Sequence, residues 1–290
     1  MSVTPGASVP RIRKDLNADA LFSLVRKEFE RIPDHRKNPT ISLPDNLMAG
    51  LAIFAFKAPS LLAFEQRQKD SNLTAVFGIK NVPSDTSLRR TLDEVNPVHL
   101  HRIFKKVFAK LQRGKGLEDM TFLDGHYLIS NDGTGYFSSD TVHCAQCLMK
   151  HHKKNGRTEY HHQFMGSVIV HPDHKEVIPL CPEPIQNTDG TQKNDCERNA
   201  SKRLVERFRR EHPHLKAIVV EDALGSNAPH LQFLQKHDIR FIIGIKPGSH
   251  GYLCATLANG TRTMHKEIDQ DGTVHRFNFV NNVPLNESTQ

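Results

Sequence analysis

The hydrophobic pattern of this chain of 290 residues changes near residue 115. Before that point, apolar residues recur three and four positions apart, which is typical of amphipathic helices. After it, short apolar runs with the composition of strands alternate with helical segments. The sequence therefore predicts two domains of different class. We expect a flexible arm over residues 1–16, an all-α domain over residues 17–115 and an α/β domain over residues 116–290.

The all-α part is expected to contain five helices. The first covers residues 18–32 and the fifth residues 98–111, while the other three begin after the capping residues Ser42, Ser60 and Ser84. The helix after Ser60 is expected to run towards residue 78. Residues 78–84, which join the third helix to the fourth, are compatible with a helix-turn-helix motif in which Arg89 and Arg90 face DNA.

This link is longer than such motifs prefer, so a plain helical bundle with a charged outer face is the favoured alternative. In either arrangement, cations on the exposed faces of the last two helices would contact phosphate groups. The candidate DNA-binding residues here are Arg89, Arg90, Lys105 and Lys106.

The second part is expected to form one mixed sheet. Strands are predicted over residues 126–131, 160–170, 176–180, 216–220 and 240–245, and helices over residues 194–211 and 229–236. Three consecutive strands, expected to be antiparallel, thus precede alternating helices and strands. This order is typical of an RNase-H-like mixed sheet with flanking helices.

Two acidic residues follow two of these strands. Asp132 comes directly after the strand ending at residue 131, and Asp222 lies just beyond the buried strand over residues 216–220. If the two strands are neighbours, both carboxylates emerge at one edge of the sheet. Carboxylates are the ligands that Mg²⁺ or Mn²⁺ prefers, and paired ions can activate both oxygens of a phosphodiester reaction. Asp132 and Asp222 are therefore the candidate catalytic and metal-binding residues.

These acids also have purely structural interpretations. An Asp before Gly133 commonly forms a turn, and Glu221 with Asp222 can cap a helix. Glu221 also competes with Asp222 for the catalytic position. Because side chains alternate along a strand, only one of these two neighbours is expected at the active edge.

A second candidate metal site lies in the segment HCAQC, residues 143–147. Two cysteines separated by two residues, with histidines nearby, supply the soft ligands that tetrahedral Zn²⁺ takes. The candidate zinc ligands are Cys144, Cys147, His151, His152, His161 and His162. The adjacent Lys150, Lys153 and Lys154 would then be held against phosphate groups. The alternative is a pair of reduced cysteines in a basic loop.

The charge balance indicates a polyanionic partner. The chain has 39 Lys and Arg residues and 32 Asp and Glu residues, which gives a net charge of +7. A moderately basic enzyme with a solvated surface is the alternative. The longest apolar run, residues 47–56, is too short to span a bilayer, and the N-terminus lacks the apolar region of a signal peptide. We therefore expect a cytoplasmic protein without membrane contact.

Several motifs occur in a characteristic order along residues 25–290. They are FERIPDHR (29–36), SLP (42–44), SLLAF (60–64), VFG (76–78), PSDTSLR (83–89), LDEVNP (92–97), NDGTGYFSS (131–139), YHH (160–162), KNDCE (193–197), DAL (222–224) and GIK (244–246). Together they resemble DDE transposases of bacterial insertion sequences, of the IS4-like, H-repeat-associated type. This resemblance implies an RNase-H-like fold, a divalent metal ion, cleavage and joining of DNA ends, and a homo-oligomer assembled on DNA. Lys246, at the end of a predicted strand, is a further candidate phosphate contact.

The resemblance also implies a third catalytic acid, a Glu on a helix beyond a β-rich insertion. Glu287 lacks that helical context, so we expect the chain to stop before the third acid. One interpretation is a transposase that is nearly inactive in this form. The other is a catalytically inactive, DNA-binding transposase derivative. A helical Glu encoded just past residue 290 would favour the enzyme, and a stop codon there would favour the binding protein.

Overall fold

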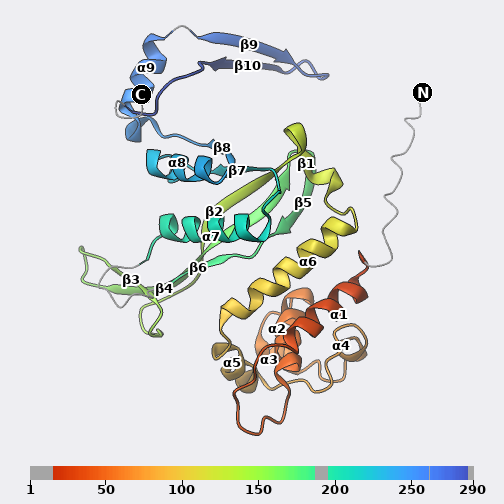
Figure 1. Cartoon of the computed structure of the whole chain (residues 1–290). Coiled ribbons are helices and arrows are strands. Elements are labelled where there is room, and N and C mark those ends of the chain that lie inside the picture. Colours follow the sequence, from red (N-terminus) through yellow and green to blue (C-terminus); the bar gives the residue numbers. More distant parts are fainter. Residues whose placement is uncertain (1–15, 187–194, 261, 287–290) are drawn as a thin grey trace. The chain divides into compact units, whose positions relative to one another are not determined.

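The computed structural model describes residues 16–186, 195–260 and 262–286 (Figure 1). The chain divides into two compact units, Met1–Met120 and Thr121–Gln290. The expected arm over residues 1–16 lies outside the described residues except for Leu16, and Glu287 lies outside them as well.

The described elements of the first unit are helices. They are α1 (Ala18–Phe29), α2 (Leu43–Ala55), α3 (Leu61–Glu65), α4 (Ser71–Ala75), α5 (Asp85–Asp93) and α6 (His101–Arg113), with a 3-10 turn over Pro97–Leu100 before α6. The predicted caps are present: Ser42 accepts from the Asp45 amide, and Ser84 accepts from the Ser87 amide. Met48, Phe64, Leu73 and Leu88 are fully buried in the core of this unit.

The single helix predicted from Ser60 towards residue 78 is wrong. Ser60 does cap α3, but α3 ends after Glu65, and α4 starts anew with Asp70 as its cap. The Asp70 side chain accepts a hydrogen bond from the Asn72 amide at 3.0 Å. A side chain that satisfies the free amides of a first turn begins a new helix, and this local competition divides the segment.

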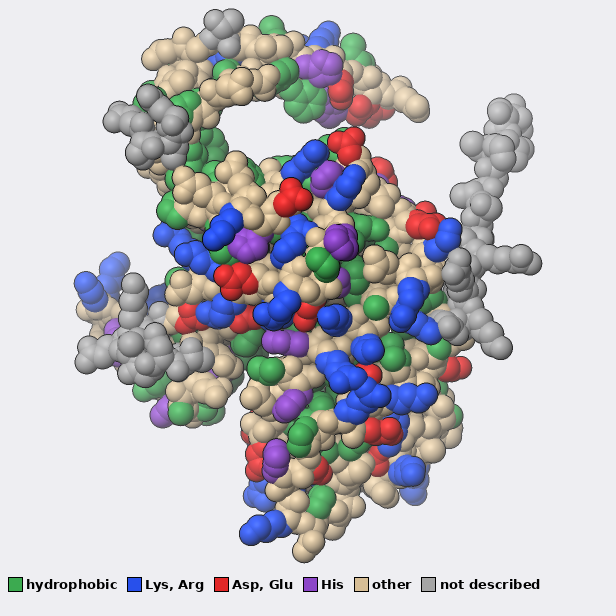
Figure 2. Space-filling model, in the orientation of Figure 1, with side chains coloured by type: hydrophobic (Ala, Val, Ile, Leu, Met, Phe, Trp, Pro, Cys, Tyr) green, Lys and Arg blue, Asp and Glu red, His purple; other side chains and the backbone are tan. Residues whose placement is uncertain are grey.

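The candidate DNA-binding cations of this unit are exposed. Arg89 and Arg90 lie on the outer side of α5, opposite the buried Leu88, and Lys105 and Lys106 lie on α6, whose buried side contains Ile103 and Phe108. Lys and Arg side chains are spread over the face seen in Figure 2. Contact of these residues with DNA remains a prediction.

The second unit contains one large mixed sheet. Its main path follows the order β3 (Leu148–His151), β4 (Thr158–His171), β2 (His126–Ser139), β7 (Ala217–Glu221) and β8 (Arg240–Ile243). Further pairings add β1 (Thr121–Phe122) to β2, and β5 (His174–Pro179) and β6 (Glu183–Ile185) to β4. β2, β4 and β5 pair antiparallel in succession, whereas β2, β7 and β8 pair in parallel. The predicted mixed sheet with three antiparallel strands first is confirmed.

Two helices accompany the parallel strands. α7 (Glu197–Glu211) precedes β7, and α8 (Ala228–Lys236) lies between β7 and β8 in the chain (Figure 1). Beyond them come α9 (Gly251–Asn259) and a separate two-stranded hairpin of β9 (Thr263–Ile268) and β10 (Val274–Phe279). None of the helices in the described part of the chain combines the length and the apolar character that a membrane crossing requires.

β2 is longer than predicted. Its pairing with β7 ends at Ser130 and Val220, but its pairing with β4 continues to Ser139, with a register shift between Gly135 and Phe137. Asp132 therefore lies inside β2, not after it. The antiparallel partner satisfies the backbone groups of these residues, so the glycines and polar side chains after Asp132 do not end the strand.

Two arginines of α7, Arg203 and Arg207, form ion pairs within the second unit. Arg207 is 5% exposed, and its guanidinium pairs with Glu183 and donates to the Cys181 and Pro182 carbonyl oxygens. Arg203 pairs with both Glu183 and Asp195 at 2.7 Å. Both cations are engaged within the second unit because β6 lies beside α7.

Candidate functional site

Asp132 and Asp222 lie beside one pocket of the second unit. The parallel pairing of β2 with β7 has Ser130 opposite Val220, and each acid is two residues beyond this pair. Asp222 directly follows the last residue of β7, and its Oδ1 accepts from the Leu224 amide at 2.9 Å. Both acidic residues are exposed and line the same pocket.

Glu197 also lines this pocket, and the sequence analysis missed its role. Glu197 is the first residue of α7 and is partly buried. Burial raises the pKa of the Glu197 carboxyl, and the negative charges of Asp132 and Asp222 raise it further. Asp132 on β2, Asp222 just after β7 and Glu197 at the start of α7 thus line one pocket, and their negative charges repel one another. The signal available in the sequence was an acid at the expected start of a long helix, within the KNDCE motif.

Gly133 provides the space for the Glu197 carboxylate. The Glu197 side chain lies over Gly133, where any Cβ atom would overlap Oε1 and Cδ of Glu197. A side chain at position 133 would displace the carboxylate from the pocket. The glycine that follows Asp132 therefore permits close approach of α7 to β2.

Glu221 also lines the pocket, but its carboxylate is engaged by three neighbouring side chains. Its Oε1 accepts from Asn131 Nδ2 at 3.1 Å and from Ser201 Oγ at 3.4 Å, while Oε2 lies 2.7 Å from His230 Nε2. The Glu221 side chain is 8% exposed. Of the two adjacent acids, Glu221 thus joins β7 to β2, α7 and α8, and Asp222 is the exposed one.

The carboxylates of Asp132, Asp222 and Glu197 suit hard divalent cations. Oxygen ligands with unbalanced negative charge are the donor set of Mg²⁺ and Mn²⁺. In the described part of the chain, the carboxylates do not form a group with all ligand atoms within 4.8 Å of one another. A pair of ions about 3.5 to 4 Å apart needs a wider set of ligands than one ion does.

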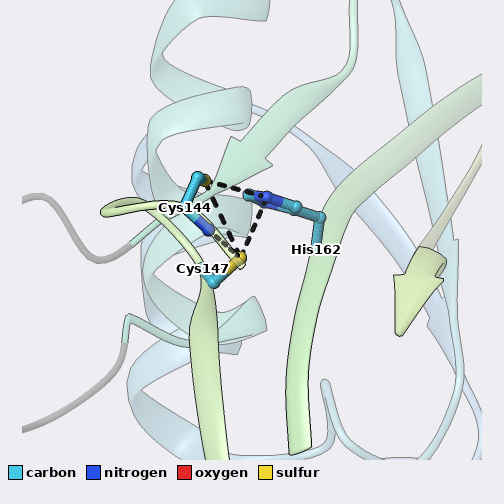
Figure 3. Close-up of side chains that lie close together, drawn as sticks. All are labelled: Cys144, Cys147 and His162. Carbon is cyan, nitrogen blue, oxygen red and sulfur yellow. Dashed lines mark hydrogen bonds between the residues drawn. The ribbon is translucent and has the colours of Figure 1, made fainter. Parts of the chain in front are cut away.

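Three soft ligands, Cys144, Cys147 and His162, do lie together (Figure 3). Their ligand atoms are all within 4.8 Å of one another. The two sulfur atoms are 3.7 Å apart, and each lies 3.3 Å from His162 Nε2. Burial raises the pKa of the Cys147 thiol, and burial lowers the pKa of the His162 ring, as does the neighbouring His161.

The other three candidate zinc histidines are not part of this group. His151 Nδ1 lies 3.0 Å from Thr158 Oγ1, and His152 Nε2 lies 2.9 Å from Glu159 Oε2. His161 comes next to His162 on β4, so its side chain points to the opposite face of the sheet. Strand alternation therefore selects one histidine of the pair.

The remaining candidate phosphate contacts are exposed lysines. Lys150 lies on β3, Lys153 and Lys154 lie in the turn between β3 and β4, and Lys246 follows β8. Lys246 does not line the carboxylate pocket, whereas Arg198 on α7 does.

Neither a protein-family model nor a curated protein sequence matches this chain. Among solved structures, the chain is similar to a piggyBac transposase synaptic complex with hairpin DNA, with a TM-score of 0.43 and 12% identity over 97% of this chain and 65% of that chain. A pre-cleavage Mos1 transpososome matches with a TM-score of 0.19 and 11% identity over 72% of this chain and 61% of that chain. The Mos1 mariner paired end complex with Mn matches with a TM-score of 0.21 and 13% identity over 82% and 72%. TM-scores this low do not establish a shared fold. The chain spans about two thirds of the length of the piggyBac chain.

Proposed function

We propose that this chain is a metal-dependent polynucleotidyl transferase of the DDE transposase type, built on an RNase-H-like sheet and acting on DNA. The observation that carries the proposal is the convergence of Asp132, Asp222 and Glu197, from three separate elements, on one pocket. The ordered sequence motifs that resemble DDE transposases support the same reaction class.

In this proposal the three carboxylates hold Mg²⁺ or Mn²⁺. The residues fit such ions, because they offer hard oxygen donors whose mutual repulsion a cation would relieve. The bound ions would supply charge stabilisation to the attacking and leaving oxygens of a phosphodiester. Glu197 takes the part of the third acid that the resemblance had placed beyond residue 290.

The chain's own residues position the phosphodiester. Gly133 leaves room for the Glu197 side chain, and the hydrogen bonds of Glu221 tie the end of β7 to β2 and α8. Arg198, at the second position of α7, places a guanidinium beside the pocket, where it can pair with a phosphate oxygen. Exposed lysines and the net charge of +7 favour a polyanionic substrate.

Metal binding tests this proposal independently of activity. We expect the purified chain to bind Mn²⁺, as measured by electron paramagnetic resonance titration, and Asp132→Asn and Glu197→Gln each to weaken binding by about 10-fold or more. Glu206→Gln is the matched control, because Glu206 is an exposed acid on the same helix. Equal Mn²⁺ affinity in Glu197→Gln and Glu206→Gln would contradict the role of Glu197.

A cleavage and strand-transfer assay on DNA with Mg²⁺ or Mn²⁺ tests the chemistry. We expect metal-dependent cleavage that Asp132→Asn reduces by about 10²-fold or more. DNA binding without any cleavage, in a chain that binds Mn²⁺, would overturn the enzyme assignment and favour the inactive DNA-binding derivative.

A further inference from the structure

The ligand atoms of Cys144, Cys147 and His162 form a compact triangle. For Zn–S near 2.3 Å and Zn–N near 2.0–2.1 Å, tetrahedral angles place two sulfurs about 3.8 Å apart and a sulfur about 3.6 Å from a nitrogen. The corresponding distances here are 3.7 Å between the sulfurs and 3.3 Å from each sulfur to Nε2. The sulfur–sulfur edge thus agrees with tetrahedral zinc to about 0.1 Å, and the two sulfur–nitrogen edges are shorter by about 0.3 Å, which a ligand–zinc–ligand angle somewhat below tetrahedral accommodates.

The backbone between the two cysteines forms a tight turn. The Cys147 amide donates to the Cys144 carbonyl oxygen at 3.2 Å, and the Cys144 amide donates to Cys147 Sγ at 3.3 Å. This turn points both sulfurs to one side, toward the ring of His162 on β4 (Figure 3). Both cysteines are free thiols, so both sulfurs are available as ligands.

Aromatic rings fix the third ligand. The His162 ring stacks on Tyr136, with centroids 5.8 Å apart, and contacts Phe137, with centroids 5.7 Å apart. Both aromatic residues lie on β2, so neighbouring strands hold the imidazole in place before any ion binds. Cys147 is only 4% exposed, so part of the ligand group is shielded from solvent. Preorganised soft ligands in such an environment select Zn²⁺ over the hard cations of the carboxylate pocket.

We propose that Cys144, Cys147 and His162 bind one Zn²⁺, separate from the carboxylate site. Cys144 is exposed, so solvent reaches the group and water can take the fourth position. The ion ties the loop before β3 to the middle of β4. This cross-link stabilises the β3–β4 hairpin, which presents Lys150, Lys153 and Lys154.

Metal analysis of protein purified without a histidine tag tests the site directly. We expect about one zinc per chain, and Co²⁺ substitution should produce thiolate-to-cobalt charge-transfer and tetrahedral d–d bands. Cys144→Ser should remove these bands and lower zinc affinity by more than about 100-fold. Cys196→Ser and His161→Asn are matched controls that should keep zinc, because Cys196 is an exposed cysteine elsewhere and His161 adjoins His162.

Alkylation of the wild-type chain is a second test, which does not depend on the folding of any variant. Zinc should slow the iodoacetamide reaction of Cys144 at least about 10-fold relative to chelator-treated protein, while the exposed Cys196 reacts equally in both. A folded wild-type chain that takes up neither Zn²⁺ nor Co²⁺, or Cys144 reactivity unchanged by zinc, would overturn the proposal. Neither result bears on Mn²⁺ binding at Asp132, so the two proposals fail separately.

Discussion

At the scale of single residues, Gly133 has the clearest functional consequence. A Cβ atom there would overlap the Glu197 carboxylate, whereas one at Gly135, on the same strand, would find its nearest atom 3.9 Å away. Gly133→Ala is therefore expected to displace Glu197 and weaken Mn²⁺ binding by about 10-fold. Gly135→Ala should leave Mn²⁺ binding unchanged, and circular dichroism should show both variants folded. Equal Mn²⁺ affinities would show that Glu197 does not need its present position.

Asp34 carries a pH-dependent contribution to stability. Hydrogen bonds from the Arg36 guanidinium, at 2.7 and 2.8 Å, are the main cause that lowers the pKa of the Asp34 carboxyl below its usual value. A group with a lowered folded-state pKa stabilises the protein above its unfolded pKa, about 3.9, and loses that contribution as pH falls through the folded pKa.

Asp34→Asn should therefore lower the free energy of unfolding by about 1 kcal/mol at pH 7. The difference from wild type should begin to shrink as the pH falls below about 4, where Asp34 of the unfolded chain becomes protonated, and should vanish below the lower pKa of the folded state. Urea unfolding of both proteins, followed by circular dichroism at several pH values, measures this difference in the free energy of unfolding. A difference that stays constant down to acid pH would contradict the assigned ion pair.

At the scale of elements, α7 depends on a buried ion pair with the segment around β6. Arg207 is almost fully buried, and it pairs with Glu183 and donates to two backbone carbonyl oxygens. Arg207→Ala would leave these acceptors with fewer donors, so we expect the free energy of unfolding to fall by about 3 kcal/mol.

Arg210→Ala is the matched control for this prediction. Arg210 lies on the same helix but is exposed, so its loss should change stability by less than about 0.5 kcal/mol. Urea unfolding of both variants provides the comparison. Equal destabilisation would mean that helix propensity or net charge dominates over the buried pair.

At the scale of the whole molecule, the positive charge predicts salt-dependent DNA binding. Each phosphate neutralised adds about −0.9 to the slope of log K against log salt concentration. Replacing Lys150, Lys153 and Lys154 by Gln should therefore make the slope less steep by about 2 to 3. These three lysines are exposed on one hairpin of the second unit.

A control with the same change in charge separates the hairpin from net charge. Lys175, Lys202 and Lys236 are also exposed, but they lie on β5, α7 and α8. Their triple replacement by Gln should change the slope less than the hairpin variant does. Identical slopes in both variants would assign DNA binding to net charge and remove the specific role of the hairpin.

Features with local causes could be predicted from the sequence. Ser42 and Ser84 could be identified as helix caps because a capping side chain bonds an amide only three residues away. The strand before Asp222 could be identified because its run of apolar residues is continuous in the sequence. The order of strands and helices also predicted the mixed sheet. Asp132 and Asp222 could therefore be predicted at one edge of the sheet, provided that their strands are neighbours.

Features with distant partners required the tertiary structure. Glu197 joins Asp132 and Asp222 because its side chain packs against Gly133 of β2, and the buried Arg207 finds its ion-pair partner in Glu183. Likewise, β2 continues past Asp132 because β4 pairs with it, and that register selects His162 from four candidate histidines. Local sequence patterns reflect only interactions between residues that are close in the sequence. Contacts between residues far apart depend on the sheet register and helix packing of the folded chain, which no short stretch of sequence contains.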